Sequence, residues 1–228
     1  MIKLRALLTL AVLSLLIAAG CGSNKSNNSA SSNSSTEGPT NASGCKTVPN
    51  PKPRPQPHLA APTLKLNPKK TYIAHVMTSC GDFDITLDVQ DQPKTTASFV
   101  YLVRKKFYDG LKFHRIAPAF VIQGGDPLGK GTGGPGYSIT ETPPNSIKYT
   151  SGIVAMAKAP QEPAGTSGSQ FFVVTGEDIG LPPDYAVLGK VTKGMDVVNK
   201  IGVVKPKAGS PDIPSDIIVM RQITVSEN

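Results

Sequence analysis

The stretch FHRIAPAFVIQGGDP, residues 113–127, sets one arginine among apolar residues and follows it with an amide at Gln123 and a Gly-Gly-Asp-Pro turn. The period of two along a strand places Phe113 on the same face as Arg115 and His114 on the opposite face. A guanidinium keeps its charge, so it must reach solvent or find hydrogen-bond acceptors. On this segment alone, Arg115 is either a long side chain that covers apolar surface at a sheet edge or a functional residue.

A second stretch, GIVAMAKAPQEPAGTSGSQFFVVT at residues 152–175, reads as a strand, a loop rich in Pro, Gly and Ser, and another strand. The second strand opens with Ser-Gln-Phe-Phe, so an amide again stands next to aromatic residues. These motifs and the GTGG at residues 131–134 occur in the order and spacing found in the cyclophilins. Over about residues 72–225 the chain therefore resembles a cyclophilin-type peptidyl-prolyl isomerase.

The resemblance implies a site for proline-containing peptides, with two groups of residues. It implies catalytic roles for Arg115, Phe120, Gln123 and Phe172. It implies substrate contacts for Val121, Gly131, Thr132, Met156, Ala157, Lys158, Ala159, Gln170, Leu181 and Tyr185. The apolar cup for the proline ring would consist of Phe120, Val121, Phe172 and Leu181, with Met156 nearby. Gln123 and the main chain of Lys158 would bind the substrate backbone, and we expect Phe171 to pack in the core.

Prolyl isomerisation requires little chemical equipment. The barrier of about 18–20 kcal/mol arises from amide resonance, and X-Pro bonds isomerise unaided in tens to hundreds of seconds. A catalyst needs only to bind the twisted amide better than the planar one. As the bond twists, the proline nitrogen gains a lone pair, and a fixed guanidinium can donate a hydrogen bond to it. Arg115 is the candidate for this role, and the reaction implies no cofactor and no metal.

The sequence departs from the family pattern in the expected site. Val121 stands where methionine is common, and Lys158 replaces the usual asparagine, although a main-chain contact would survive that change. Gly180 occupies the position where the best-known members carry tryptophan, and Tyr185 stands where they carry histidine. Because the family inhibitor cyclosporin relies on this loop, we expect only weak cyclosporin binding.

Other enzyme classes lack their motifs. The run GGDPLGK at residues 124–130 nearly matches a P-loop, but Gly131 stands where Ser or Thr should bind magnesium. After residue 70 only His75 and His114 remain as histidines, and the chain contains no HExxH, CxxC or GxSxG motif. His114 is therefore expected to be structural. The net charge of +8 comes without a clustered basic stripe, so we expect no nucleic-acid binding.

The N-terminal segment resembles a bacterial lipoprotein leader. Residues 1–20 carry two basic residues and then an apolar run that ends in small residues, which is typical of a signal peptide. Cys21 follows at the place of a lipid-accepting cysteine, although an ordinary cleaved signal remains the alternative. We expect residues 21–70 to be a disordered tether, rich in Ser and Asn and then in Pro, whose Pro-rich end from residue 46 forms a stiff polyproline II spacer.

Two further cysteines, Cys45 and Cys80, form an even pair. Outside the cytosol such a pair is compatible with a disulfide, which would attach the end of the tether to the domain. Two free thiols are the alternative, and the sequence leaves the choice open.

The expected isomerase domain covers residues 71–228 and reads as mainly β. Alternating apolar residues predict a hairpin over residues 72–89 and a last strand over 217–225. Apolar spacing predicts a helix over residues 93–106 and a short one near 195–201. Many short strands with two helices suggest a closed antiparallel barrel, and the resemblance implies eight strands with a helix at each open end.

We therefore expect a membrane-tethered, extracytoplasmic peptidyl-prolyl isomerase that acts on unfolded or exported polypeptides, and we expect it to be a monomer. A peptide-binding chaperone module with the same groove and little turnover is the alternative. The presence of Arg115, Phe120, Gln123 and Phe172 favours the enzyme.

Overall fold

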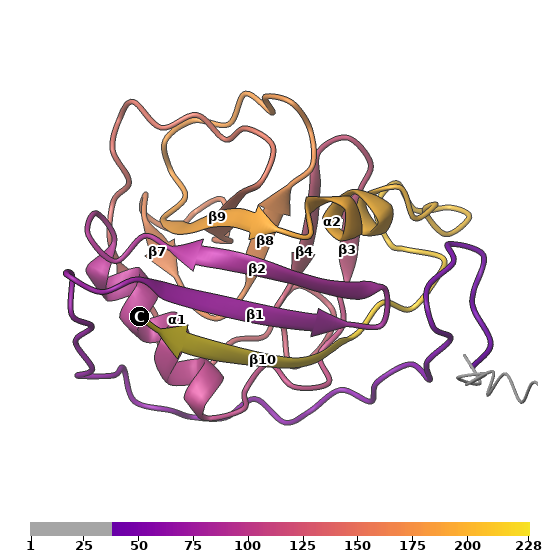
Figure 1. Ribbon diagram of the computed structural model, residues 1–228, viewed down its shortest axis with the longest axis horizontal. Coiled ribbons are helices and arrows are strands. Elements are labelled where there is room, and N and C mark those ends of the chain that lie inside the picture. The colour runs from indigo at the N-terminus through magenta and orange to yellow at the C-terminus, as the bar shows by residue number, and fades with distance from the viewer. Residues whose placement is uncertain (1–37) are drawn as a thin grey trace, which may run out of the picture. The chain divides into compact units, whose positions relative to one another are not determined.

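Ten strands and two helices make up the described part of the chain, residues 38–228 of a computed structural model (Figure 1). The expected signal peptide, Cys21 and the tether up to residue 37 lie outside the described residues. Within residues 38–228, neither helix is long and apolar enough to cross a bilayer.

Eight strands form one antiparallel sheet in the order β10-β1-β2-β9-β6-β8-β4-β3. Their bounds are β1 Tyr72–Thr78, β2 Gly81–Leu87, β3 Arg115–Ala117, β4 Val121–Gly124, β6 Ile153–Met156, β8 Phe171–Val174, β9 Val187–Lys193 and β10 Met220–Glu227. Two short strands, β5 Ile139–Thr140 and β7 Thr166–Ser167, pair separately. Both the β1–β2 hairpin and the final strand were expected, and the fold is mainly β.

The sheet is a half-barrel rather than the closed barrel that we expected. Its edge strands β3 and β10 do not pair with each other along their described lengths. The segment before β3 pairs with the start of β10 instead: Gly110 N–H donates to Met220 O and Met220 N–H donates to Leu111 O, both at 2.8 Å. The reason is local: β3 has three residues, and its Ile116 N–H donates at 2.8 Å to the carbonyl of Asp212, in the loop before β10.

The hairpin of β1 and β2 follows the sequence pattern. Phe83, Ile85 and Leu87 alternate with polar residues and are buried, because successive side chains of a strand point to opposite faces. Across the strands Val76 pairs with Phe83, so the apolar faces of both strands are joined in register. This register places the hairpin's apolar side against the core.

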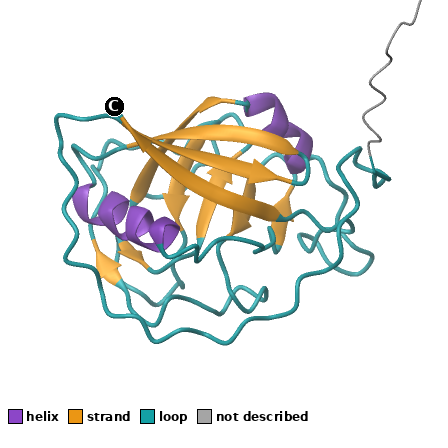
Figure 2. Ribbon diagram, turned by 60° about the horizontal axis from the view of Figure 1, so that its bottom comes forward, coloured by secondary structure: helices purple, strands orange, loops and turns teal. Residues whose placement is uncertain are grey.

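Two helices lie at opposite ends of the sheet (Figure 2). They are α1, Pro93–Arg104, and α2, Met195–Gly202. The first turn of α1 has no local side-chain cap. Instead, the N–H groups of Lys94 and Thr95 donate at 3.0 and 2.7 Å to the carboxylate of Glu141, whose negative charge suits a helix N-terminus.

The core consists of two clusters of buried side chains. The main cluster includes Phe83, Phe99, Phe113 and Phe171, and a smaller second cluster comprises Val121, Tyr149, Ala155, Phe172 and Val174. The neighbours Phe171 and Phe172 belong to different clusters because β8 alternates its side chains between two faces. The expected core position of Phe171 is confirmed.

The Pro-rich segment, residues 46–70, packs along the domain and is called the strap below. It runs beneath β10 and α1 in the view of Figure 1. Its Arg54 N–H donates to Pro127 O and its Leu59 N–H to Pro135 O, both at 2.9 Å, while Leu66 is buried in the main cluster. The strap therefore differs from the expected free spacer. An extended chain leaves its N–H groups unpaired, and here some of them bind loop carbonyls.

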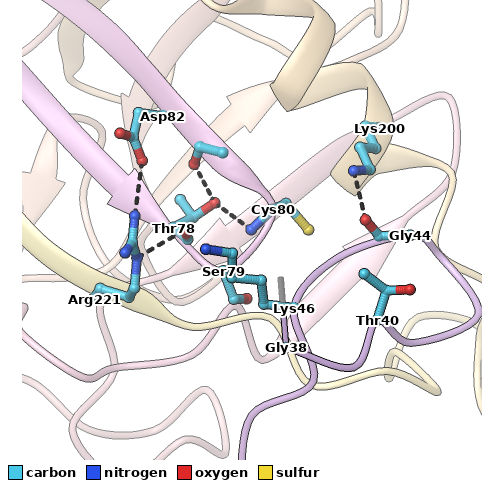
Figure 3. A pocket seen from close by; sticks show the side chains of 11 residues that line it. Gly38, Thr40, Gly44, Lys46, Thr78, Ser79, Cys80, Asp82, Lys200 and Arg221 are labelled. Carbon is cyan, nitrogen blue, oxygen red and sulfur yellow. Dashed lines mark hydrogen bonds and ion pairs between the residues drawn. The ribbon is translucent and has the colours of Figure 1, made fainter. Parts of the chain in front are cut away.

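A disulfide joins Cys45 to Cys80, with 4.3 Å between the two Cα atoms. It attaches the residue just before the strap to the turn between β1 and β2. A hollow of about 330 Å³ lies beside it (Figure 3). In this hollow Arg221 donates to Thr78 O at 3.0 Å and to the Asp82 carboxylate at 3.2 Å. The hollow is lined by none of the residues expected to catalyse isomerisation.

Candidate active site

Arg115 is the first residue of β3 and pairs in register with Gln123 of β4. Its Nε donates to Oδ2 of Asp212 at 2.7 Å, and its Nη1 donates to Oε1 of Gln123 at 3.5 Å. Its guanidinium carbon lies 5.7 Å from the centre of the Phe120 ring, which is within cation–π range. The side chain is about one third exposed, so the charge lies at the surface between an anion, an amide and an aromatic ring.

The expected common face of Phe113 and Arg115 is wrong. Phe113 is fully buried in the main cluster, where its ring packs edge-on against Phe171. The period of two fails here because regular pairing begins only at Arg115, so Phe113 lies before the strand. Arg115 is therefore placed by its pairing with β4, and not by continuity with Phe113.

Two glutamine amides form a chain of hydrogen bonds with Arg115. Gln123 Nε2 donates to Gln170 Oε1 at 3.1 Å, and Gln170 Nε2 donates to the carbonyl of Gly133 at 2.9 Å. The amide nitrogen of Gln123 thus faces Gln170, and its oxygen faces the guanidinium. These hydrogen bonds join residues from β3, β4, the position just before β8 and the loop that contains Gly131 and Thr132.

Asp126 organises that loop, residues 126–134. Its carboxylate accepts hydrogen bonds from the N–H groups of Leu128, Lys130, Gly131 and Thr132. Burial alone would raise the pKa of Asp126, but the N–H donors outweigh burial and hold that pKa below its ordinary value. The carboxylate therefore stays ionised and fixes the loop backbone, which leaves Gly131 and Thr132 exposed at the surface.

An apolar patch lies over the second cluster. Val121 and Phe172 are buried, and Phe120, Leu181 and Tyr185 pack against them while remaining partly exposed. The rings of Phe172 and Tyr185 meet edge to face with centroids 5.5 Å apart. The structure thus brings all four residues of the expected proline cup into one cluster, and one of them, Phe120, also lies next to Arg115.

Met156 does not belong to this patch. It is 1% exposed and packs in the main cluster, directly across from Phe171. Its neighbours Ala155 and Ala157 contact the second cluster instead, because β6 alternates its side chains. The expected substrate contact of the Met156 side chain is therefore not available in this structure.

The segment after β6 carries the other expected contacts. Ala157 N–H donates to Gln170 O at 2.9 Å, and Ala159 N–H donates to the carboxylate of Glu162 at 2.6 Å. Between them, the main chain of Lys158 has no backbone hydrogen-bond partner within the described part of the chain. The Lys158 ammonium lies 5.6 Å from the centre of the Tyr185 ring. An extended peptide strand can pair with such a free backbone position.

Comparison with known proteins identifies the family. The family model described as "Cyclophilin type peptidyl-prolyl cis-trans isomerase/CLD" matches residues 73–225. The chain belongs to this family. This cyclophilin is accordingly a peptidyl-prolyl cis-trans isomerase. The strap and the disulfide's Cys45 precede the matched residues.

Relatives of this cyclophilin come from bacteria and eukaryotes. It is 40% identical over 135 residues to a peptidyl-prolyl cis-trans isomerase of Helicobacter pylori, covering 58% of this chain and 81% of the relative. It is 37% identical over 161 residues to the human peptidyl-prolyl cis-trans isomerase-like 1, covering 69% and 92%. A crystal structure of a Cryptosporidium parvum cyclophilin, in the presence of the dipeptide Ala-Pro, has a TM-score of 0.62 and 30% identity, covering 68% of this chain and 99% of that one.

Two residues of the site escaped the sequence reasoning. Asp212 forms the ion pair with Arg115 from a position 97 residues further along the chain. Tyr149 lies buried under the patch, where its hydroxyl donates to Tyr185 O at 2.6 Å and accepts from Tyr185 N–H at 3.0 Å. Burial raises the pKa of Tyr149 to about 12, so the hydroxyl keeps its proton for this bond. In the sequence, both residues stand in Pro-containing loop segments that give no signal of the contact.

Proposed function

We propose that Arg115 is the electrostatic catalyst of this isomerase, and that the enzyme acts on unfolded or exported polypeptides outside the cytoplasm. The observation that carries the first part is the position of the guanidinium, which is fixed at the rim of the apolar patch beside Phe120. A proline ring on the patch would bring its nitrogen toward a permanent positive charge. That charge stabilises the lone pair that develops as the amide twists.

The patch supports proline binding. Phe172 and Val121 form its floor, and Phe120, Leu181 and Tyr185 surround them. A pyrrolidine ring is apolar, and its burial against such side chains contributes roughly 0.8 kcal/mol per CH₂ group. The Cryptosporidium parvum cyclophilin was crystallised in the presence of the dipeptide Ala-Pro, which supports the same ligand chemistry for this chain.

Polar groups around the patch are suited to hold the peptide backbone. Gln123 presents an amide between Arg115 and Gln170, and the main chain of Lys158 has no backbone partner in the described residues. Gly131 and Thr132 are exposed on the loop fixed by Asp126. We assign Gln123 and Lys158 to the residues next to proline, and Ala157, Ala159, Gln170, Gly131 and Thr132 to the groove beyond them. Holding the flanking backbone would fix the reacting bond relative to Arg115.

The test is isomerisation of a proline peptide by the full chain and by Arg115→Ala. We expect the variant to lose about 2.7–4 kcal/mol of transition-state stabilisation, the range for removal of one key donor. Arg221→Ala is the matched control, because Arg221 forms an ion pair with Asp82 at the hollow of Figure 3. We expect it to retain its turnover.

Two outcomes would contradict this assignment. Turnover of Arg115→Ala at the wild-type rate would reject the role of the guanidinium. Tight peptide binding by the wild-type chain with negligible turnover would favour the chaperone alternative instead. Peptide affinity is therefore measured beside turnover for all three proteins.

The extracytoplasmic location rests on the sequence before residue 38 and on one contact. Residues 1–20 match a signal peptide, and Cys21 stands where a lipid would attach. The disulfide between Cys45 and Cys80 is typical of an oxidising compartment, which supports export. The intact mass of protein extracted from membranes tests the lipid. An unmodified mass at Cys21, or an unchanged membrane fraction for Cys21→Ala, would contradict the anchor.

A further inference from the structure

We infer that Asp212 is a positioning residue for the isomerase reaction, which holds one edge of the Arg115 guanidinium so that the other edge faces the substrate. The inference rests on the proposed role of Arg115. It adds a residue from the loop between α2 and β10, a segment that the sequence motifs of the site do not include (Figure 1).

The ion pair has the geometry of a directed contact. Asp212 Oδ2 accepts from Arg115 Nε at 2.7 Å, a length typical of a charge-assisted hydrogen bond. Each side chain is about one third exposed. An ion pair of this exposure contributes only about 0–1 kcal/mol to stability. Its larger effect is therefore expected on the orientation of the guanidinium rather than on folding.

The carboxylate is itself held in place by its backbone. Asp212 O accepts from Ile116 N–H at 2.8 Å, so residue 212 lies beside the residue that follows Arg115 in β3. Ser210 Oγ accepts from the N–H groups of Asp212 and Ile213 at 3.5 and 3.1 Å. The loop thus runs beside the edge strand β3. From this position the Asp212 carboxylate lies within hydrogen-bond distance of the Arg115 side chain.

The remaining contacts of Arg115 define what is left for substrate. A guanidinium has five N–H donors in a planar fork. The Nε donor is used by Asp212, one donor of Nη1 faces Gln123, and Phe120 lies near the guanidinium. The other donors of the two Nη groups remain for the proline nitrogen. Without Asp212, the long side chain would regain rotamers in which these donors point into solvent.

The charge of Asp212 and its positioning role predict opposite changes in turnover when the residue is removed. If the carboxylate acted only by its charge, it would partly neutralise Arg115, and its removal would raise turnover. If it acts by position, its removal lowers turnover, because a displacement of about 1 Å in a catalytic group can cost a factor on the order of 100. Since the Arg115 guanidinium is a flexible surface group without this contact, we expect position to dominate.

The experiment measures kcat and KM of the full chain with Asp212→Ala and Asp212→Asn. We expect Asp212→Ala to lower kcat about tenfold with little change in KM, as for an interaction that matters in the transition state. Asp212→Asn keeps an acceptor oxygen for Arg115 Nε and should retain turnover within about threefold of wild type. A rise in kcat, or an unchanged kcat in Asp212→Ala, would overturn the inference.

A double-mutant cycle separates positioning from a general structural effect. In the Arg115→Ala background, Asp212→Ala should cause no further loss, because the residue acts only through the guanidinium. An equal tenfold loss in both backgrounds would show that Asp212 acts on the fold and would reject positioning. The Nε–H resonance of Arg115 in NMR spectra provides a second readout, and we expect its shift to move in Asp212→Ala more than in Asp212→Asn.

Asp216→Ala is the matched control. Asp216 lies in the same loop and is partly buried, but its carboxylate accepts from Ser43 Oγ at 2.7 Å and is not part of the Arg115 network. We expect wild-type turnover, although the same charge is removed. An equal loss in Asp216→Ala would attribute the effect to the loop and reject positioning. The two hypotheses remain distinguishable: unchanged turnover in Arg115→Ala rejects the proposed function, whereas loss there with none in Asp212→Ala rejects only the positioning role.

Discussion

His114, the neighbour of Arg115, is a mostly buried imidazole whose ring lies close to Gly131. Neither ring nitrogen has a hydrogen-bond partner within the described chain. Burial lowers its pKa from the ordinary 6.5, the charge of Asp126 raises it, and the nearby Lys112 and Arg115 lower it further. The net effect is a lowered pKa, so the folded protein favours the neutral form of the His114 imidazole.

We expect stability to fall as the pH drops below about 6.5 because the unfolded chain then binds a proton at His114 that the folded chain excludes. Above that pH the unfolded residue is also neutral, so the stability is fully present. Urea midpoints between pH 8 and 5 measure the effect for wild type and His114→Asn. A slope that is equally steep in the variant would contradict this origin.

The contribution of Asp126 to the free energy of unfolding changes in a different, more acidic pH range. Its lowered pKa means that the contribution is present above its ordinary pKa of 3.8 and is lost as the pH falls through the folded value. The two titrations therefore do not overlap above pH 5, and the His114 comparison is not confounded by the carboxylate.

For single residues, the sequence predicts a contact of Arg115 only where the contacting residue is close to it along the chain. Gln123 lies opposite Arg115 across a tight hairpin, so one motif contains both residues. Asp212 is 97 residues away, and only the folded sheet brings it beside β3. The prediction for Met156 was wrong for another reason, because it placed Met156 and Ala157 together in the site. Side chains alternate along β6, so Met156 points into the main cluster while Ala155 and Ala157 contact the second one.

Among the elements, the strap extends the domain beyond the part that matches the family. Its N–H groups hold the carbonyls of Pro127 and Pro135 at both ends of the loop that carries Gly131. Gly136 leaves room for it, since a Cβ there would come within 2.5 Å of Pro57 O. Two sets of contacts therefore hold this loop. The strap binds the carbonyls at its ends, and the Asp126 carboxylate binds N–H groups within it.

We expect Leu66→Ala to destabilise the enzyme by about 2–3 kcal/mol, since Leu66 is a buried strap residue and deletion of core methyl groups costs 2–5 kcal/mol. The lower end applies because this site lies at the margin of the core. Denaturant unfolding measures the change, with the exposed neighbour Lys65→Ala as the control. Equal stability of Leu66→Ala and wild type would indicate that the strap contributes little to folding.

The Pro-rich composition of the strap does not predict whether this segment packs on the domain. Seven prolines between residues 46 and 70 predict an extended chain but do not say whether it is free. The deciding residues are Leu59, Leu64 and Leu66, which pack on the main cluster. Closure of the barrel was similarly beyond the sequence pattern, because it depends on whether β3 pairs with β10 or with the loop at Asp212.

For the molecule as a whole, the disulfide constrains the N-terminal part of the described chain. It closes a loop of 35 residues between Cys45 and Cys80. Chain entropy predicts that such a loop stabilises the fold by roughly 3–4 kcal/mol.

We therefore expect the variant with Cys45→Ser and Cys80→Ser to unfold at lower denaturant than oxidised wild type, and to match wild type in a strong reductant. Unfolding curves with and without dithiothreitol measure both. A midpoint in the variant equal to that of the oxidised protein would contradict the estimate. Because neither cysteine contacts the residues around Arg115, we expect turnover of the folded variant to be unchanged.

Docking of the strap also limits the tether. Packing begins before Cys45, so only residues 22–37 separate Cys21 from the described domain. Fully extended, these residues reach at most roughly 55 Å. On the proposed anchor, residue 38, where the described domain begins, would lie within that distance of the bilayer surface.

If the proposed lipid anchor at Cys21 is present, the bond between Cys45 and Cys80 has one more consequence. A protease that cuts the backbone anywhere between residues 46 and 70 leaves two fragments that are still covalently joined. On the proposed anchor, such a nick would not release the catalytic domain from the membrane until a reducing agent broke the disulfide. Gel electrophoresis of clipped protein should accordingly show one band without thiol and two bands with it.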